Sequence, residues 1–424
     1  MLVKFMKTMM ILLKFNKIFR FAKFLIQFNL FYLNLMWRAS LVTKIEVMMK
    51  SNFRITWGML LFSTILNNIG VQQMGYYMPI YSEFLLYGTT FFYTIMFAIT
   101  AWIVQENWKL SWDVWKTTIW LGLFTSLNGI FAQISIPFVD PEITTIIVQI
   151  SAPVVWGVHV FMFRDKQFTL FHLFSIIIIL IGVFFGPIIS LFYGSGAMSN
   201  YVNGFWIFIT LCSAIPTGFE TLFQEKAYRL QAAPKFVTLT FYNLFSFIWY
   251  FLWSFMTTID PFGTCVDGFP ALNECAAKTR PCKMNELVAH QIDSWKCFFG
   301  DTENVPCCGD RATLWVMVFT IGYYFTFTVG AFFLRVHTAN SVANTNAFST
   351  PLTSMFFWLP VIITGHSHSE FKWWILVSFI MIGIGIVGYE SYGGLNHRFN
   401  KILLNKSDRL EEGLIEINNN TSKY

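Results

Sequence analysis

The sequence is short of charge. Only 12% of its 424 residues are Asp, Glu, Lys or Arg, whereas 55% are hydrophobic and 19% are aromatic. Soluble domains carry roughly a quarter charged residues, so this composition excludes an ordinary soluble protein and indicates a polytopic membrane protein. The net charge of +6 then reflects basic loops at one membrane face, and we expect no nucleic-acid partner.

Apolar segments of about 20 residues are long enough to cross a bilayer as helices. The joins between such segments are short and polar, except for the long stretch 259–311. We predict an all-α membrane protein in which residues 54–392 form ten transmembrane helices, between a basic N-terminal segment (1–53) and a disordered tail (393–424). The ten predicted helices are 55–75, 84–104, 117–136, 142–163, 169–189, 203–223, 237–258, 312–334, 339–364 and 372–391.

No lysine or arginine lies in the interior of any predicted helix. A carrier of nucleotide sugars or phosphate esters brings an anion to the middle of the membrane, where fixed cations usually stabilise it. The missing cations therefore argue against that class and favour cationic, zwitterionic or small neutral solutes. Nucleophile, metal and phosphate-binding motifs are missing too, so we expect no enzyme, no metal and no cofactor.

Six of the seven cysteines crowd into the segment 259–311, which we call the cysteine loop. An even cluster in a polar loop predicts disulfides and an oxidising compartment. Zinc is disfavoured because the loop has no paired CxxC motif. Six cysteines allow 15 pairings, and the sequence does not choose among them. The six are Cys265, Cys275, Cys282, Cys297, Cys307 and Cys308.

Lysine and arginine counts predict the orientation. If both termini share one side with the even-numbered loops, that side receives 23 basic residues and the other side six. Basic loops are usually cytosolic, so the termini are predicted to be cytosolic and the cysteine loop lumenal or extracellular. Residues 1–53 are a targeting or surface-lying segment, or upstream sequence without a function; we favour the last interpretation.

A weak internal repeat relates the two halves. A shift of 198 places Ser151-Ala152-Pro153 on Ser349-Thr350-Pro351, and a slightly larger shift places Phe168–Gly182 on Phe371–Gly385. The fourth and ninth helices cross the membrane in opposite directions. We therefore predict a 5+5 inverted repeat, a transporter architecture, with a first repeat of about 54–190 and a second of about 201–392.

Polar residues and prolines inside the predicted helices indicate a central cavity, because a broken helix must face protein or water rather than lipid. The alternative for each polar residue is a plain hydrogen bond between helices. We expect helix breaks or hinges at Pro153, Pro216 and Pro351. Glu220, near the cytosolic end of its helix, is a candidate proton or cation site, and the alternative is that its side chain extends to the cytosol. The predicted cavity residues are Asn67, Asn68, Gln72, Gln133, Gln149, Ser151, Asn243, Asn344 and Ser349.

Three features resemble the chloroquine resistance transporter-like family of the drug/metabolite transporter superfamily. They are QISAPVVW (149–156), CSAIPTGFETLFQEKAYR (212–229) and the cysteine loop before the eighth helix. The resemblance covers roughly residues 54–392. The family pattern has a Q-x-S-x-P segment in helix four, a S-A-x-I-P segment in helix six and a cysteine-paired loop between helices seven and eight.

The resemblance implies a ten-helix, monomeric carrier in an acidic digestive-vacuole or lysosome-like membrane. Such a carrier exports amino acids, peptides or weak-base drugs to the cytosol, driven by protons, and so limits the osmotic load of the vacuole. Glu225 matches a family glutamate, which makes it a second candidate proton or cation site. In the malaria-parasite member of this family, a position in helix one determines drug transport, and Asn67 and Asn68 fall at that position. This sequence departs from that member in two ways. Its loop has six cysteines instead of four, and Thr125 lies near the place of an acidic residue in the third helix.

Two other functions remain open from the sequence. One is a nucleotide-sugar or phosphate-ester carrier of the same superfamily, which the missing cations disfavour. The other is a membrane receptor or scaffold that binds a ligand through its cysteine loop. The leading hypothesis is a secondary transporter that works by alternating access on a small-molecule substrate.

Overall fold

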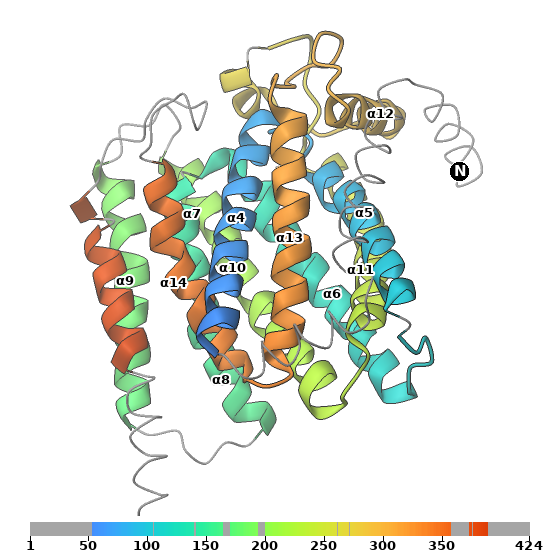
Figure 1. The fold of residues 1–424 in the computed structure, drawn as a ribbon. Helices are drawn as coiled ribbons and strands as arrows, with labels where there is room; N and C mark the ends of the chain where they lie inside the picture. The colour runs from blue at the N-terminus through green and yellow to red at the C-terminus, as the bar shows by residue number, and fades with distance from the viewer. Residues whose placement is uncertain are drawn as a thin grey trace, which may run out of the picture.

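The computed structural model describes residues 53–104, 106–139, 141–163, 170–193, 200–260, 262–270, 272–357, 373–374 and 376–388. These residues form a bundle of helices covered at one end by the cysteine loop (Figure 1). They contain helices and no strand, so the predicted all-α class is confirmed for the described part of the chain. The predictions for residues 1–52 and 389–424 lie outside it.

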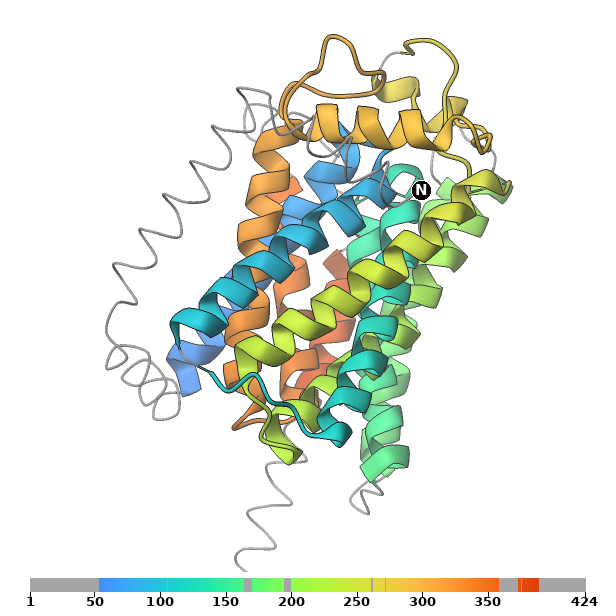
Figure 2. The same cartoon turned by 90° about the vertical axis from the view of Figure 1, so that its right-hand side faces the viewer.

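The long helices of the bundle are α4 (Phe53–Tyr77), α5 (Ser82–Ile103), α6 (Trp112–Ser135), α9 (Leu170–Tyr193), α10 (Asn200–Glu225), α11 (Lys235–Trp253), α13 (Ala312–Leu334) and α14 (Ala339–Phe357). Shorter helices are η1 (Ile136–Phe138), α7 (Pro141–Val148), α8 (Ser151–Phe163), η2 (Lys226–Leu230), η3 (Ser254–Thr258), η4 (Leu272–Glu274), η5 (Ala276–Lys278) and α12 (Leu287–Phe298). A further apolar helix covers Leu376–Gly388. Figure 2 shows α12 lying across the end of the bundle, over the tips of the long helices.

Four helical segments are long and apolar enough to cross a membrane: Leu85–Ile103, Gly204–Leu230, Lys235–Thr258 and Ala312–Leu334. Shorter apolar segments lie at Ile146–His159, Leu173–Phe185 and Leu376–Gly388. Each of the ten predicted segments overlaps a described helix. The crossing of the membrane by all ten, and the 5+5 repeat, remain predictions.

The outer face of α9 is apolar and exposed. Phe174, Ile177, Ile181, Phe184 and Ile188 follow a helical spacing of three or four residues, and each has more than a third of its surface exposed. An exposed apolar stripe of this length is unfavourable in water. It is the expected surface of a helix that faces lipid.

Glycines bring α4 and α13 into close contact. A Cβ atom added to Gly70 would lie 2.7 Å from the backbone nitrogen of Phe319, and one added to Gly322 would lie 2.7 Å from that of Asn67. Only glycine permits this separation, because any side chain would meet backbone on the opposite helix. The contact fixes α4 against α13 near the middle of both helices.

The other helices pack in pairs around this contact. Helix α5 packs on α11, α6 packs on α10 and α11, and α14 packs on α4. Between α9 and the helix Leu376–Gly388 the contacts are reciprocal. A Cβ atom on Gly182 would lie 3.1 Å from the Ser378 carbonyl oxygen, and one on Gly385 would lie 2.9 Å from the Ser175 carbonyl oxygen.

Replacing Gly322 by Ala should destabilise the protein. The new methyl group would overlap the α4 backbone, and overpacking costs about 1–3 kcal/mol, which outweighs the roughly 1 kcal/mol that alanine gains in a helix. Thermal unfolding in detergent would measure the loss. Gly330→Ala on the same helix is the control, because its nearest neighbour is a Leu60 methyl group 3.9 Å away. A Gly322→Ala variant as stable as Gly330→Ala would contradict the close packing.

Candidate functional site

The six cysteines of the cysteine loop form three disulfides, as the sequence predicted. Cys265 pairs with Cys282, Cys275 with Cys307, and Cys297 with Cys308, closing loops of 17, 32 and 11 residues. All six sulfur atoms are used, and Cys212 in α10 is a free thiol. The pairing itself was not predictable, because it depends on how α12 and the flanking turns fold back on one another.

The cysteine loop is hydrogen-bonded to the ends of three helices. The Cys282 N–H donates to the Thr257 carbonyl at 2.9 Å, the Gly309 N–H donates to the Tyr77 carbonyl at 2.9 Å, and the Tyr81 hydroxyl donates to the Pro306 carbonyl at 2.8 Å. These contacts join the loop to the ends of α11 and α4 and to the start of α5. We call this side of the bundle the loop end.

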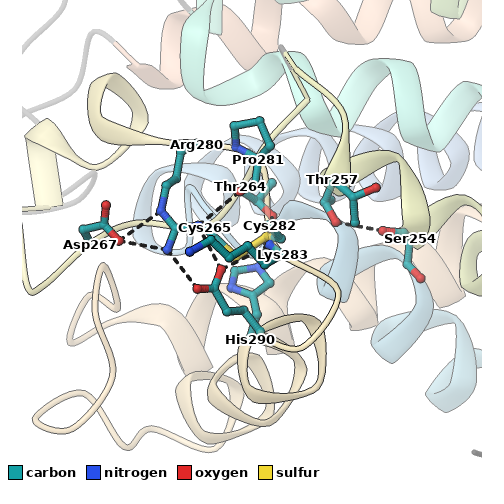
Figure 3. Close-up of a disulfide and its surroundings, with 12 residues drawn as sticks. Ser254, Thr257, Thr264, Cys265, Asp267, Arg280, Pro281, Cys282, Lys283 and His290 are labelled. Carbon is teal, nitrogen blue, oxygen red and sulfur yellow. Dashed lines mark hydrogen bonds and ion pairs between the residues drawn. A yellow bond between two sulfur atoms is a disulfide. The ribbon is translucent and has the colours of Figure 1, made fainter.

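An ion-pair cluster lies beside the first disulfide (Figure 3). The Arg280 guanidinium donates to Asp267 at 2.8 Å and to Glu286 at 2.8 Å. Hydrogen bonds from Arg280 lower the pKa of Glu286 to about 2 and also lower the pKa of Asp267. The cluster therefore stays charged at acidic pH and holds the loop turn in place.

His290 of α12 lies on the other side of the same disulfide, near Thr264 (Figure 3). Its Nε2 atom is 3.2 Å from the Thr264 hydroxyl, and its ring lies 5.1 Å from that of Tyr81. Burial lowers the pKa of His290 to about 4, although Asp293 on the same helix opposes this shift. The imidazole thus packs as a neutral ring between the loop and the start of α5.

One predicted pair of cavity residues meets between α4 and α14. Asn68 Nδ2 donates to Ser349 Oγ at 3.4 Å, and Ser349 donates in turn to the Asn346 carbonyl at 2.7 Å. Asn344 is buried one turn earlier on α14. Asn67 belongs to a different contact, since its backbone lies under Gly322 of α13. Asn68 and Ser349 therefore form a polar contact between the two helices, which we call the α4–α14 site.

The predicted fourth helix is divided in two. Helix α7 ends at Val148, two residues form a turn, and α8 begins at Ser151. Within the turn, the Gln149 and Ile150 N–H groups reach back three residues, to Ile146 and Ile147, instead of four. Pro153 is the third residue of α8, where a helix needs no internal N–H donor. Gln149 and Ser151 are buried at this turn.

The three predicted hinges have different surroundings. Pro153 lies directly after the turn between α7 and α8, whereas α10 continues through Pro216 and α14 continues through Pro351. A hinge role for any of the three remains a prediction. Gln72 and Gln133 are buried near the loop end of α4 and α6, and the structure does not bring either to the α4–α14 site by a described contact.

Asn243 joins helices. Its Nδ2 atom donates to the Leu239 carbonyl at 2.7 Å, and its Oδ1 atom accepts from the Tyr323 hydroxyl at 3.4 Å. The Tyr323 hydroxyl also lies 3.1 Å from that of Tyr242, and its ring stacks on that of Tyr93 at 4.0 Å. This set connects α5, α11 and α13. The tyrosines were missed at the sequence level because single aromatic residues are common in apolar helices.

Glu220 is a buried carboxylate in the C-terminal half of α10, with 5% of its surface exposed. Its Oε2 atom accepts from Asn128 of α6 at 3.2 Å, and its Oε1 atom accepts from Gln224 at 3.3 Å. Tyr242, Tyr250 and Tyr323 lie close enough for its charge to act on them. Within the described ranges, no lysine, arginine or histidine lies within ion-pair distance of Glu220.

Glu225 is also buried but is fully engaged at the end of the bundle opposite the loop. Its Oε1 atom pairs with Arg229, and its Oε2 atom accepts the Ala339 N–H at the start of α14 at 2.8 Å. His159 of α8 lies 3.9 Å from the same oxygen. A carboxylate at a helix N-terminus is favoured by the free N–H groups there. Glu225 thus connects α8, α10 and α14, and a proton or cation role for it remains a prediction.

A second capping glutamate was missed. Glu106, in the turn after α5, accepts the Lys235 N–H at 3.1 Å and the Val237 N–H at 3.0 Å, at the start of α11. Burial raises the pKa of Glu106, and the backbone hydrogen bonds partly offset the shift. Lys235 itself is buried, with its Nζ atom 3.8 Å from the centre of the Phe332 ring. In the sequence, the capping role of Glu106 is indicated only by its position, an acidic residue in a short turn between two apolar segments.

Comparison with known families decides the assignment. The family described as CRT-like, chloroquine-resistance transporter-like, matches residues 54–389. The chain belongs to the CRT-like family. This confirms the resemblance and identifies a multi-pass membrane protein of a transporter family. Membership agrees with the apolar helices and with the disulfide-bonded cysteines, and is consistent with a protein that is not an enzyme.

Other comparisons add little to the CRT-like assignment. No curated protein matches the chain. A solved structure titled "Crystal structure of protein" is similar at 13% identity, covers 79% of this chain and 94% of that chain, and has a TM-score of 0.45.

The stability of the CRT-like chain should fall in acid because of His290. An unfolded histidine binds a proton below about pH 6.5, whereas folded His290 resists protonation until about pH 4. The contribution of neutral His290 to the free energy of unfolding is therefore fully present above about pH 6.5. It decreases as the pH falls towards about 4, because only the unfolded state binds the proton in that range. The loss is at most about 3 kcal/mol, and less where water reaches the ring.

Thermal unfolding in detergent between about pH 7.5 and about pH 4.5 would measure this effect, because the unfolded histidine takes up its proton within this range while the folded one resists it. The His290→Gln variant should lose less stability over the range than the wild type. Asn285→Ala, at an exposed position of the cysteine loop, is the control, and it should keep the wild-type slope. Equal slopes for all three proteins would show that His290 is not protected from protonation.

Proposed function

We propose that the protein is a secondary transporter that moves small cationic or zwitterionic solutes, such as amino acids, peptides and weak bases, from an acidic vacuole to the cytosol. Protons drive the movement, and the helices alternate access between the two sides. Membership of a transporter family supports the general function. The observation that carries the finer proposal is Glu220, a buried carboxylate whose described neighbours include no cation.

A buried ionised carboxylate without a cation is strongly unfavourable. Such a group becomes stable when it takes a proton or when a cation arrives from outside. Intramembrane acids of this kind are typical of proton and ion pathways. Because Glu220 lies among α6, α10, α11 and α13, it is separate from the polar region between α4 and α14. We therefore assign the proton to Glu220 and the solute to the α4–α14 site.

The contacts between helices support the inverted repeat. In the predicted repeat, α4 corresponds to α10, α6 to α13, and α8 to α14. The contact between α4 and α13 therefore corresponds to that between α10 and α6, and the contact between α4 and α14 to that between α10 and α8. All four contacts are present. The same exchange turns the Gly182–Ser378 contact into the Gly385–Ser175 contact. Reciprocal contacts of this kind are expected when two repeats are related by a twofold axis in the membrane plane.

The disulfides and the basic residues support the orientation. Three disulfides favour an oxidising compartment for the cysteine loop. The opposite end carries Arg229, Lys235 and Arg335, as expected for a cytosolic face. The ion pairs of Arg280 keep the loop turn charged in acid. These features fit a loop that faces an acidic lumen.

Transport by purified protein in liposomes tests the proposal. With acid on the cysteine-loop side, labelled arginine or a labelled dipeptide should move with the proton gradient, and the flux should saturate. The Glu220→Gln variant should lose the stimulation by acid while remaining folded. Glu274→Gln, at an exposed loop position, is the control and should behave as wild type. Glu220→Gln with an unchanged pH dependence would refute the assignment of the proton.

The solute site has a separate test. Ser349→Ala removes one hydrogen-bonding group from the α4–α14 site, and a single hydrogen bond is worth about 1 kcal/mol, so the KM for solute should rise about fivefold. The pH dependence should stay unchanged. Ser378→Ala, a buried serine outside this site, should leave KM unaltered. An equal KM for all three proteins would place the solute elsewhere.

A further inference from the structure

Two amide side chains meet the Glu220 carboxylate, one on each oxygen. Asn128 reaches across from α6 to Oε2 at 3.2 Å, and Gln224 reaches from the next turn of α10 to Oε1 at 3.3 Å. Asn128 lies on α6, whereas Glu220 and Gln224 lie one turn apart on α10, and the packing of α6 on α10 brings the three residues together. Neither amide has an alternative described partner that would account for its position.

The choice of amides has a chemical consequence. A carboxylate only accepts hydrogen bonds, whereas a protonated carboxyl group also donates one. A carboxamide has both an NH₂ donor and a carbonyl acceptor, and rotation of its terminal group exchanges them. A lysine or arginine would serve only the charged form. An amide serves both forms, which is what a carboxyl group that gains and loses a proton requires.

The tyrosine neighbours of Glu220 cannot take this role, because their hydroxyl groups have other partners. The Tyr242 hydroxyl is shared with that of Tyr323 at 3.1 Å, and Tyr323 also donates to Asn243. The Tyr250 hydroxyl donates to the Thr125 carbonyl at 3.0 Å. These are the titratable groups that α11 and α13 present to Glu220.

The remaining charged groups of the neighbouring helices lie at a different place. His159 of α8 and Arg229 of η2 both lie against Glu225, the last residue of α10, near the start of α14. They are engaged there rather than at Glu220. The surroundings of the Glu220 carboxylate are therefore two amides, the buried Thr125 hydroxyl and three tyrosines, without a fixed cation among the residues that the structure describes.

We propose that Asn128 and Gln224 are positioning residues that form a two-amide clamp on Glu220 and hold its side chain in both the charged and the protonated state. This inference rests on the proposed proton role of Glu220. In the step, hydronium on the acidic side transfers its proton to Oε2 and becomes water, the negative charge of the carboxylate is neutralised, and the Asn128 amide turns so that its carbonyl accepts the new O–H. The reverse step releases the proton to water.

The clamp also gives the proton a route to helix movement. Asn128 belongs to α6, and Glu220 belongs to α10, so the protonation state changes a hydrogen bond between helices. Nearby, Phe124 stacks on Phe219 at 4.9 Å, and Ser135 and Thr210 share a hydrogen bond of 2.8 Å. These two contacts do not depend on protonation. The change is therefore local to the part of the α6–α10 interface that surrounds Glu220.

The pH profile of flux in liposomes tests the clamp. Asn128→Leu keeps the size of the side chain but removes its donor, which destabilises the charged carboxylate. The midpoint of the profile should move about 1–2 pH units higher, because hydrogen bonds to charged groups are worth more than neutral ones. Gln224→Leu should move the midpoint in the same direction. Gln231→Leu, which removes an amide seven residues later in the chain, should leave the midpoint unchanged.

Infrared difference spectroscopy gives a second measurement that needs folded protein but no transport. The carbonyl stretch of protonated Glu220, identified by its loss in Glu220→Gln, should move to higher frequency in Gln224→Leu, because Gln224 donates to Oε1, which is the carbonyl oxygen once the proton is on Oε2. An unchanged stretch in Gln224→Leu, or an unchanged midpoint in Asn128→Leu, would overturn the clamp. If Glu220→Gln itself keeps the wild-type pH dependence, the proposed function fails instead, so the two failures are distinguishable.

Discussion

The close contact between α4 and α13 is the constraint on which the rest of the bundle depends. Gly70 and Gly322 allow the two backbones to touch, and this fixes the rotation of α4 about its axis. With α13 on one face, α4 presents Asn68 to α14 on another. Its last residue, Tyr77, then meets the cysteine loop. In a membrane, where apolar surface gives no preference for one helix partner over another, such small-residue contacts decide the packing.

Polar groups then select the remaining partners. Glu225 joins the ends of α8, α10 and α14, and Glu106 joins the turn after α5 to the start of α11. Both carboxylates accept backbone N–H groups at helix starts, where donors are left over. Glu220 differs, because its partners are side-chain amides on neighbouring turns. The same residue type therefore has a structural role at two positions and, in our proposal, a functional role at the third.

The sequence predicts some of these features well. Apolar segments of helical length anticipate the long helices of the described bundle, but not α12 or the division between α7 and α8, and six clustered cysteines anticipate the disulfides. Both signals are local, since length and composition decide them. The disulfide pairing, the partners of Glu220 and the cap that Glu225 provides depend on residues about 10 to 100 positions apart, so no local pattern contains them. Similarly, the matching prolines at 153 and 351 predict similar breaks, but α7 and α8 are separated whereas α14 is continuous. Proline alone does not break a helix; its position relative to the helix start decides.

The stapled cysteine loop has a mechanical consequence. Its disulfides make it a nearly rigid cover, and its hydrogen bonds attach that cover to Tyr77, Tyr81 and Thr257. The ends of α4 and α11 and the start of α5 are thereby attached to the same loop. These three helix ends cannot separate from one another without breaking their hydrogen bonds to the loop. In the transport cycle that we propose, opening at this end would come from helices without a described hydrogen bond to the cysteine loop, such as the divided pair α7–α8 and the neighbouring α14.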